Sequence, residues 1–229
     1  MDTINKTNAT EGAKETSRIE TFSDGVFAIA ITLLILDLIQ ILHQQNEVGL
    51  IKLLLTHYQA LIAFIIGFLT ILICWINHHL VFVYLNKTDS YLMWVNGFVL
   101  LVVTFTPFPT AILAEYFDKE THVTLAFFGF NYFMMSLAAY SLCAYSYNKY
   151  LIKEDSRELF YYFKLKYRYS IIYTFLILFI GLISIPLAII LYCILFIAFA
   201  FPRQFAMRIM LMKSGRKTRL EKLKRKKHN

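Results

Sequence analysis

Charged residues are scarce in this 229-residue chain: Asp, Glu, Lys and Arg together make up 17%, whereas apolar residues make up 58%. A soluble protein of this length needs a larger share of polar residues to stay dispersed in water. Disorder of the whole chain is excluded as well, because aromatic residues account for 17% of the sequence. The composition therefore predicts an integral membrane protein.

The sequence also lacks the residue patterns that carry most catalytic and metal chemistry. Its three cysteines, Cys74, Cys143 and Cys193, lie far apart in apolar stretches, where cysteine serves as a small packing residue. No HExxH, GxSxG or CxxC motif is present, so an intramembrane enzyme is the weakest functional hypothesis. We expect no catalytic site, no bound metal and no cofactor.

Long apolar stretches divide the chain into spans, each of which needs about 20 residues to cross a bilayer as a helix. Four spans are predicted at about 19–41, 54–80, 90–114 and 122–147. The stretch 169–201 is too long for one ordinary span, and Gly181 and Pro186 interrupt it. We divide it into two short spans that meet near 182–185, with one long kinked helix as the alternative. The predicted fold is an all-α integral membrane protein with six transmembrane helices per subunit.

Basic residues are distributed unevenly between the two sides of the predicted membrane. With the N-terminus inside, 21 of the 23 Lys and Arg residues fall in cytoplasmic segments, and only Lys52 and Lys119 lie outside. Because cytoplasmic loops carry an excess of basic residues, this distribution predicts a multi-pass cell-membrane protein with both termini cytoplasmic. Eleven basic residues lie between Arg203 and Lys227, and we expect this segment to contact anionic lipids and not nucleic acid.

The predicted organisation has three parts. Residues 1–18 are polar and are expected to form a disordered cytoplasmic N-terminus. Residues 19–203 form the six-span membrane domain, and residues 204–229 form a basic cytoplasmic tail. The longest inner connection, about 148–168, is too short for a soluble domain. The function is therefore expected to reside within the membrane.

Polar residues gather at the start of the first span. Ionisable groups within a span are costly and indicate a functional site. A capped helix N-terminus with Asp24 in its first turn is the simpler explanation, but it leaves the charge of Arg18 on the wrong side of the helix dipole. Arg18 and Asp24 are about 240° apart on a helix, so each needs a partner on another span.

An apolar stripe follows along the same span. At about 100° per residue, its large side chains fall within about 40° of one line: Phe22, Ile29, Leu33 and Leu36. Such a stripe is typical of a lipid-facing or packing surface. That is by far the commoner meaning of such a stripe, and the other is a pore lining, in which apolar rings narrow the path and gate it by excluding water. Periodicity alone leaves both interpretations open.

The segment Arg18-x-x-x-Phe22-Ser23-Asp24, followed by Gly-Val-Phe-Ala-Ile-Ala-Ile-Thr-Leu-Leu, resembles the signature of the transmembrane protein 175 family. A weaker second match is Trp75-x-x-His78-His79 in the second span, with Asn96 in the third. Members of this family are lysosomal potassium channels in animals and tetrameric six-span potassium channels in bacteria. The resemblance implies a homotetrameric potassium-selective cation channel, with K⁺ as the permeant ion and the first helix of each subunit lining the pore.

The resemblance also implies roles for individual residues. It places the principal hydrophobic constriction at Ile29, with further apolar rings at Leu33 and Leu36, and potassium selectivity at Thr32. It implies that a structural polar network anchors the first helix, made of Arg18, Phe22, Ser23, Asp24, Trp75 and His78. Trp75 and His78 are the expected partners on the second span.

A secondary transporter is the alternative hypothesis, because intramembrane carboxylates and histidines often relay protons or bind metals. The residues concerned are Asp24, Asp37, His78 and His79. No inverted repeat is evident, and we expect no Gly/Pro interruption of a span other than the break near 182–185. The two adjacent histidines also point about 100° apart on a helix, which disfavours a shared ligand.

Overall fold

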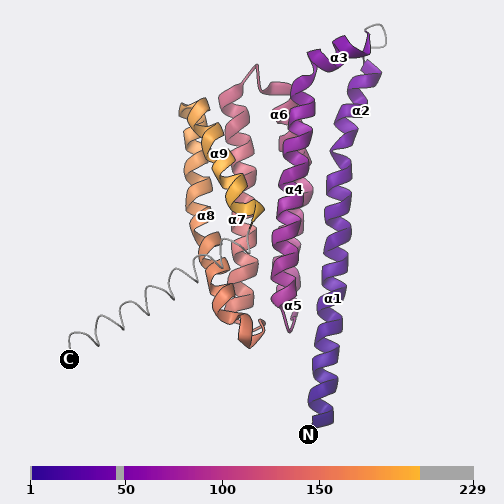
Figure 1. Cartoon of the computed structure of the whole chain (residues 1–229), viewed down its shortest axis with the longest axis vertical. Coiled ribbons are helices and arrows are strands. Elements are labelled where there is room, and N and C mark those ends of the chain that lie inside the picture. Colours follow the sequence, from indigo (N-terminus) through magenta and orange to yellow (C-terminus); the bar gives the residue numbers. More distant parts are fainter. Residues whose placement is uncertain (1, 45–48, 202–229) are drawn as a thin grey trace, which may run out of the picture.

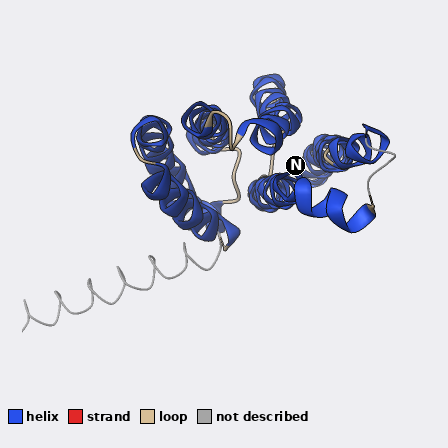
Figure 2. Cartoon of the chain, turned by 90° about the horizontal axis from the view of Figure 1, so that it is seen from above, coloured by secondary structure: helices blue, strands red, loops and turns tan. Residues whose placement is uncertain are grey.

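The computed structural model describes residues 2–44 and 49–201, and nearly all of them are α-helical. Besides one short 3₁₀ helix, Glu154–Ser156, the helices in order are α1 (Asp2–Leu33), α2 (Ile35–Gln44), α3 (Leu50–Thr56), α4 (Tyr58–Tyr84), α5 (Ser90–Phe105), α6 (Pro107–Tyr116), α7 (Thr121–Asn148), α8 (Arg157–Ile183) and α9 (Ile185–Ala200). Figure 2 shows most of the long helices nearly end-on, so they run roughly parallel to one another. The prediction of an all-α fold is confirmed.

Five helical stretches of the described chain are long and apolar enough to cross a membrane: Glu15–Leu42, Tyr58–Tyr84, Ser90–Tyr116, Thr121–Asn148 and Glu154–Ile183. They alternate in direction, as the predicted topology requires (Figure 1). The sixth predicted span corresponds to α9, which is apolar but has only 16 residues. The count of six membrane crossings stays a prediction.

The break predicted near 182–185 lies at Ser184, which separates α8 from α9. Helix α9 folds back along α8 and contacts it, so the alternative of one kinked helix is wrong (Figure 1). A second break lies at Thr106, where α5 ends and Pro107 begins α6. Our expectation that no other span has a Gly/Pro interruption is therefore wrong. The helix breaks here because proline lacks a backbone N–H donor and its ring clashes with the preceding turn.

The structure differs from the predicted boundaries in two places. Helix α1 begins at Asp2, so residues 2–18 have helical backbone where the polar composition predicts disorder. Helix α8 begins at Arg157, twelve residues before the predicted start of the fifth span at 169, so much of the inner connection 148–168 is helical. Residues 204–229, the predicted basic tail, lie outside the described residues.

Helix α1 lies at one edge of the bundle, and α8 with α9 lies at the other (Figure 1). A continuous core of buried apolar side chains joins α1 to α4, α5, α7 and α8. At the end of the bundle where α4 and α7 terminate, Leu85 forms an isolated antiparallel bridge with Ile152. The backbone N–H of Lys153 donates to the carbonyl of Tyr84 nearby. These contacts fix the two loops to each other, and α1 packs against α4 and α5.

Candidate functional site: the first helix and its anchor

Helix α1 has two faces with different environments. One face is almost completely buried against α4 and α5, and consists of Ser23, Phe27 and Ala30, continued by Leu34 in the turn before α2. These residues recur every three or four positions, which is the spacing of one helix face. A second face, about 120° round the helix, is exposed in the single chain and carries Phe22, Ile29 and Leu33 of the predicted stripe, which Leu36 continues in α2. The structure therefore places the whole stripe away from the subunit's own core.

Ile29 lies in the middle of the exposed face and is 60% exposed in the single chain. Thr32, also exposed, lies beside the stripe, and its hydroxyl donates a 2.9 Å hydrogen bond to the backbone carbonyl of Ile29. Because the proton is used within the helix, the lone pairs of the Thr32 oxygen remain available to a cation. An oxygen ligand is thus held within a turn of a large apolar side chain.

A chain of buried hydrogen bonds ties α1 to α5 and α4. The Ser23 hydroxyl donates to the backbone carbonyl of Ile19 at 2.8 Å, and Asn96 Nδ2 donates to Ser23 Oγ at 2.9 Å. Asn96 Oδ1 then lies 2.7 Å from His78 Nε2. Since the Ser23 proton is already committed, the orientation of the Asn96 amide is determined. His78 Nε2 must therefore carry a proton and donate to Asn96.

Two further polar contacts join α1 directly to α4, beside the chain of hydrogen bonds through Asn96. Trp75 Nε1 donates to Asp24 Oδ1 at 2.8 Å, and His79 Nδ1 lies 2.8 Å from Glu20 Oε1. The rings of Trp75 and His79 stack, with centroids 5.8 Å apart. Helix α4 thus holds α1 through two polar side chains on successive turns.

The structure brings together four residues of the predicted network: Ser23, Asp24, Trp75 and His78. Arg18 and Phe22 lie outside it. Arg18 is exposed and makes no hydrogen bond or ion pair with the residues whose side chains the structure describes, 15–42 and 49–201. Phe22 is 66% exposed and belongs to the apolar stripe instead. The expected contact of Arg18 with His78 and Trp75 is absent.

Two contacts were not predicted from the sequence. The resemblance names His79 and Asn96 but gives neither of them a partner. The pairing of His79 with Glu20 and the bridging position of Asn96 depend on how α4 and α5 pack against α1. The sequence signals for Asn96 are its place in the weaker second match and its amide in an otherwise apolar span. His78 and His79 face different partners, and no three metal-ligating side chains gather within the described ranges.

We expect Trp75→Phe to lower the free energy of unfolding by at least about 1.5–3 kcal/mol, because it removes the N–H donor of the hydrogen bond to Asp24 together with part of the ring that stacks on His79, and hydrogen bonds to charged groups alone are worth that much. Thermal or denaturant unfolding of the purified protein measures the effect. Trp94→Phe is the matched control, because Trp94 is 80% exposed and should be nearly neutral. Equal stability of the two variants would contradict an anchoring role for the Asp24–Trp75 pair.

The fold and the site define a multi-pass, all-helical membrane protein whose first helix is held by polar contacts and leaves an apolar face free. The sequence profile of the family described as endosomal/lysosomal potassium channel TMEM175 matches residues 18–107. The match covers the exposed stripe and the polar anchor alike.

Similarity to individual proteins points to the same family. A potassium channel of Chamaesiphon minutus is 52% identical over 103 residues, which cover 44% of this chain and 51% of that protein. A potassium channel of Streptomyces collinus is 45% identical over 130 residues, which cover 56% of this chain and 63% of that protein. The matches thus span about half to three-fifths of these two relatives.

Similarity over a longer stretch comes from the crystal structure of a lysosomal potassium-selective channel TMEM175 homolog from Chamaesiphon minutus. It aligns with a TM-score of 0.71 at 33% sequence identity, over 83% of this chain and 98% of that one. The chain belongs to the TMEM175 family. The resemblance identified in the signature is thereby confirmed.

Proposed function

We propose that this protein is a potassium-selective cation channel, assembled as a homotetramer in which α1 of each subunit lines the pore. The observation that carries the proposal is the exposed apolar stripe that runs along α1 into α2, on a different face from the one that polar contacts hold against the subunit's own core. The names of the relatives, which are potassium channels, support the same function.

One chain supplies only one wall of a pore, so the proposed pathway requires several copies around an axis. Ile29, Leu33 and Leu36 from each copy would then form successive apolar rings. A narrow apolar ring excludes water, and an ion that cannot keep its water faces a large barrier. In this arrangement Ile29 is the principal constriction and the other two residues extend it.

Selectivity is assigned to Thr32. The sequence contains no Thr-Val-Gly-Tyr-Gly segment of the kind that forms a carbonyl filter, and it contains no arginine-repeat span for sensing voltage. A ring of threonine hydroxyls replaces part of an ion's hydration shell and discriminates less strongly than a cage of carbonyls. We therefore expect modest selectivity for potassium.

The orientation follows from the distribution of charge. We place both termini in the cytoplasm and the protein in the cell membrane, because basic residues favour the cytoplasmic side. The basic residues after 203 then lie beside the inner leaflet, where they attract anionic lipids. No nucleic acid, cofactor or catalytic activity is required for this function.

Reconstitution of the purified full chain into planar bilayers tests the proposal. A channel gives unitary currents whose reversal potential follows the potassium gradient. The alternative, a secondary transporter, gives coupled and saturable flux without unitary steps. Flux of that kind would overturn the channel assignment.

Thr32→Ala is expected to leave unitary currents intact and to lower the potassium-to-sodium permeability ratio about fivefold, which corresponds to losing about 1 kcal/mol of ion–oxygen interaction. The shift of the reversal potential under bi-ionic conditions measures it. Thr104→Ala is the control, because the Thr104 hydroxyl also donates within its own helix but lies on α5. If both variants keep the wild-type reversal potential, Thr32 does not determine selectivity.

A further inference from the structure

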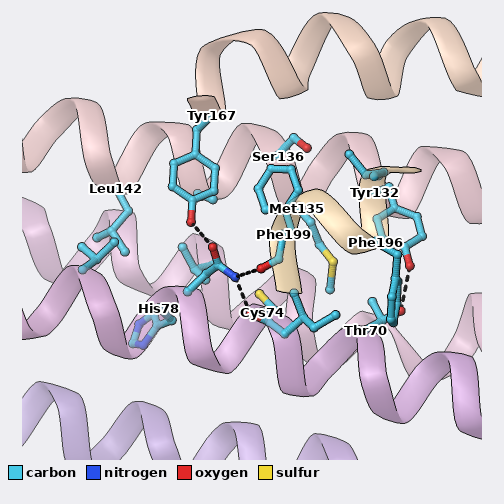
Figure 3. Close-up of a pocket in the computed structure, with 16 residues that line it drawn as sticks. Thr70, Cys74, His78, Tyr132, Met135, Ser136, Leu142, Tyr167, Phe196 and Phe199 are labelled. Carbon is cyan, nitrogen blue, oxygen red and sulfur yellow. Dashed lines mark hydrogen bonds between the residues drawn. The ribbon is translucent and has the colours of Figure 1, made fainter. Parts of the chain in front are cut away.

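A cavity of about 80 Å³ lies inside the bundle between α4, α5, α7, α8 and α9 (Figure 3). Its walls are almost entirely apolar, and no Asp, Glu, Lys or Arg of the described chain lines it. Hydrogen bonds already join Thr70 to Tyr132 and Asn77 to Tyr167, as the dashed lines show. This cavity therefore offers no counter-charge to an ionic ligand, whereas the end of the bundle where α7 turns into α8 does.

Two basic side chains of α8 lie on aromatic rings at this end. The guanidinium carbon of Arg157 is 4.5 Å from the centroid of the Tyr147 ring and 3.9 Å from that of the Tyr150 ring. Lys164 Nζ lies 4.7 Å from the centroid of the same Tyr147 ring and donates to Asn148 Oδ1 at 2.8 Å. A cation within about 6 Å of a ring centroid is attracted by the negative face of the ring. The rings therefore hold both cations at defined positions.

Neither cation has an acidic partner among the side chains that the structure describes. Glu154, Asp155 and Glu158 are close in sequence, but none of these three carboxylates forms an ion pair with Arg157 or Lys164. The guanidinium group of Arg157 carries five N–H donors in a planar fork, and it makes no hydrogen bond with any described residue. Such a fork binds carboxylate and phosphate groups through two parallel hydrogen bonds. Arg157 is therefore held in place without the anion that its geometry suits.

The backbone at Tyr150 gives a second indication. Helix α7 ends in a Schellman motif, in which the N–H of Leu151 donates to the carbonyl of Ser146 and the N–H of Tyr150 to that of Tyr147. Tyr150 has a φ of 57°, in the left-handed region where glycine is usual because a Cβ is strained there. Its side chain is 73% exposed and contributes little to the core. What a tyrosine provides at this strained position is the ring that lies on Arg157.

The depth of the hairpin identifies the source of the anion. The span Glu154–Ile183 has 30 residues, about 45 Å at 1.5 Å per residue, whereas the hydrocarbon core of a bilayer is about 30 Å thick. Its apolar residues are concentrated toward Ile183, so the excess length lies at the start, with Arg157 and Lys164. Tyr161 and Tyr169 of α8 are exposed, as is usual for tyrosine at a membrane–water interface. The two cations therefore lie among the lipid headgroups.

We propose that the hairpin between α7 and α8 binds the phosphate group of an anionic lipid headgroup. Arg157 donates two hydrogen bonds to the phosphate, and Lys164 supplies a second positive charge. Tyr147 and Tyr150 are positioning residues, because they hold the guanidinium group in place. The site is distinct from the general attraction of basic residues to an anionic leaflet, since it depends on particular side chains. It is also independent of ion conduction by the protein.

Native mass spectrometry of the purified full chain tests the site. The chain in detergent is titrated with dioleoyl phosphatidylglycerol, or with dioleoyl phosphatidylcholine, in which the choline cancels the charge of the phosphate. We expect phosphatidylglycerol to bind at least about tenfold more tightly. Equal affinities would overturn the proposal. An excess of inorganic phosphate should leave the lipid bound, and displacement by it would overturn the assignment to a lipid.

Variants of the basic residues locate the binding. Arg157→Gln should lower the preference for phosphatidylglycerol at least about fivefold. Lys149→Gln removes the same charge from the same hairpin and should keep the preference, because the exposed Lys149 side chain contacts no ring of the described chain. Arg157→Lys keeps the charge but loses the planar fork, so it should also bind more weakly than the wild type. Equal losses in Arg157→Gln and Lys149→Gln would indicate diffuse attraction and overturn the site.

Tyr150 separates positioning from folding. Tyr150→Gly relieves the left-handed backbone, so the Tm should not fall, yet the preference for phosphatidylglycerol should fall at least about threefold because Arg157 loses a ring. Tyr150→Phe keeps the ring and should keep the preference. A Tyr150→Gly chain with the wild-type preference, or one that loses stability and lipid binding together, would overturn the positioning role.

Discussion

Replacing Ile29 by asparagine is expected to raise the potassium current about tenfold, the effect of lowering the barrier at the constriction by about 1.4 kcal/mol. Ile29 is the exposed apolar side chain at the middle of the α1 stripe, and in the proposed tetramer four copies of it meet at the axis. An amide at this point offers hydrogen bonds to water, so the constriction is wetted and ions pass with part of their hydration shell. Unitary currents in planar bilayers measure the change.

Two controls separate the constriction from a general effect of polarity. Ile29→Leu keeps the ring apolar and should leave the current close to that of the wild type. Ile65→Asn makes the same isoleucine-to-asparagine change at an exposed position of α4, outside the proposed pore, and should not raise the current. A folded Ile29→Asn variant with unchanged or reduced current would show that Ile29 is not the gate.

The sequence predicts the fold well where apolar length and helical breakers decide it. The spans are long enough to exclude a soluble arrangement, and the break at Ser184 follows from Gly181 and Pro186 in a stretch too long for one helix. The turn at Leu34 between α1 and α2 has no such signal, because neither glycine nor proline lies there. The sequence analysis also did not predict that the first helix begins at Asp2. A polar composition shows that a segment has no apolar face to bury, but it does not show whether the segment can extend a helix that has already formed.

For the site, periodicity identifies which residues of the first span share a face, but it does not say which face meets the subunit's own core. Packing decides this, because Ser23 can bond only where Asn96 reaches it. The Asp24–Trp75 contact was expected from the resemblance, whereas Arg18 was expected to join it and does not. Partners on different helices depend on relative rotation and depth, and a single sequence carries neither.

Asn96→Leu is expected to be the most destabilising substitution in the anchor. It leaves Ser23 Oγ without its donor and His78 Nε2 without its acceptor, and each unsatisfied buried group costs about 1–3 kcal/mol. We therefore expect a loss of about 2–6 kcal/mol in the free energy of unfolding, measured by thermal or denaturant unfolding of the purified protein. Asn86→Leu, at an exposed position just after α4, is the matched control and should be close to neutral, because the Asn86 side chain makes no hydrogen bond with the residues whose side chains the structure describes.

A cycle with Ser23→Ala tests whether the loss arises from the hydrogen-bond chain. In the wild-type background, Ser23→Ala removes the acceptor of Asn96 Nδ2 and should be destabilising. In the Asn96→Leu background it removes a hydroxyl that has already lost this partner, so its cost should be smaller. Because Asn96 lies on α5 behind α1, away from the stripe, any assembled variant should keep the wild-type unitary current. Additive losses, or an Asn96→Leu protein of normal stability with altered unitary current, would contradict the assignment of this chain of hydrogen bonds to anchoring.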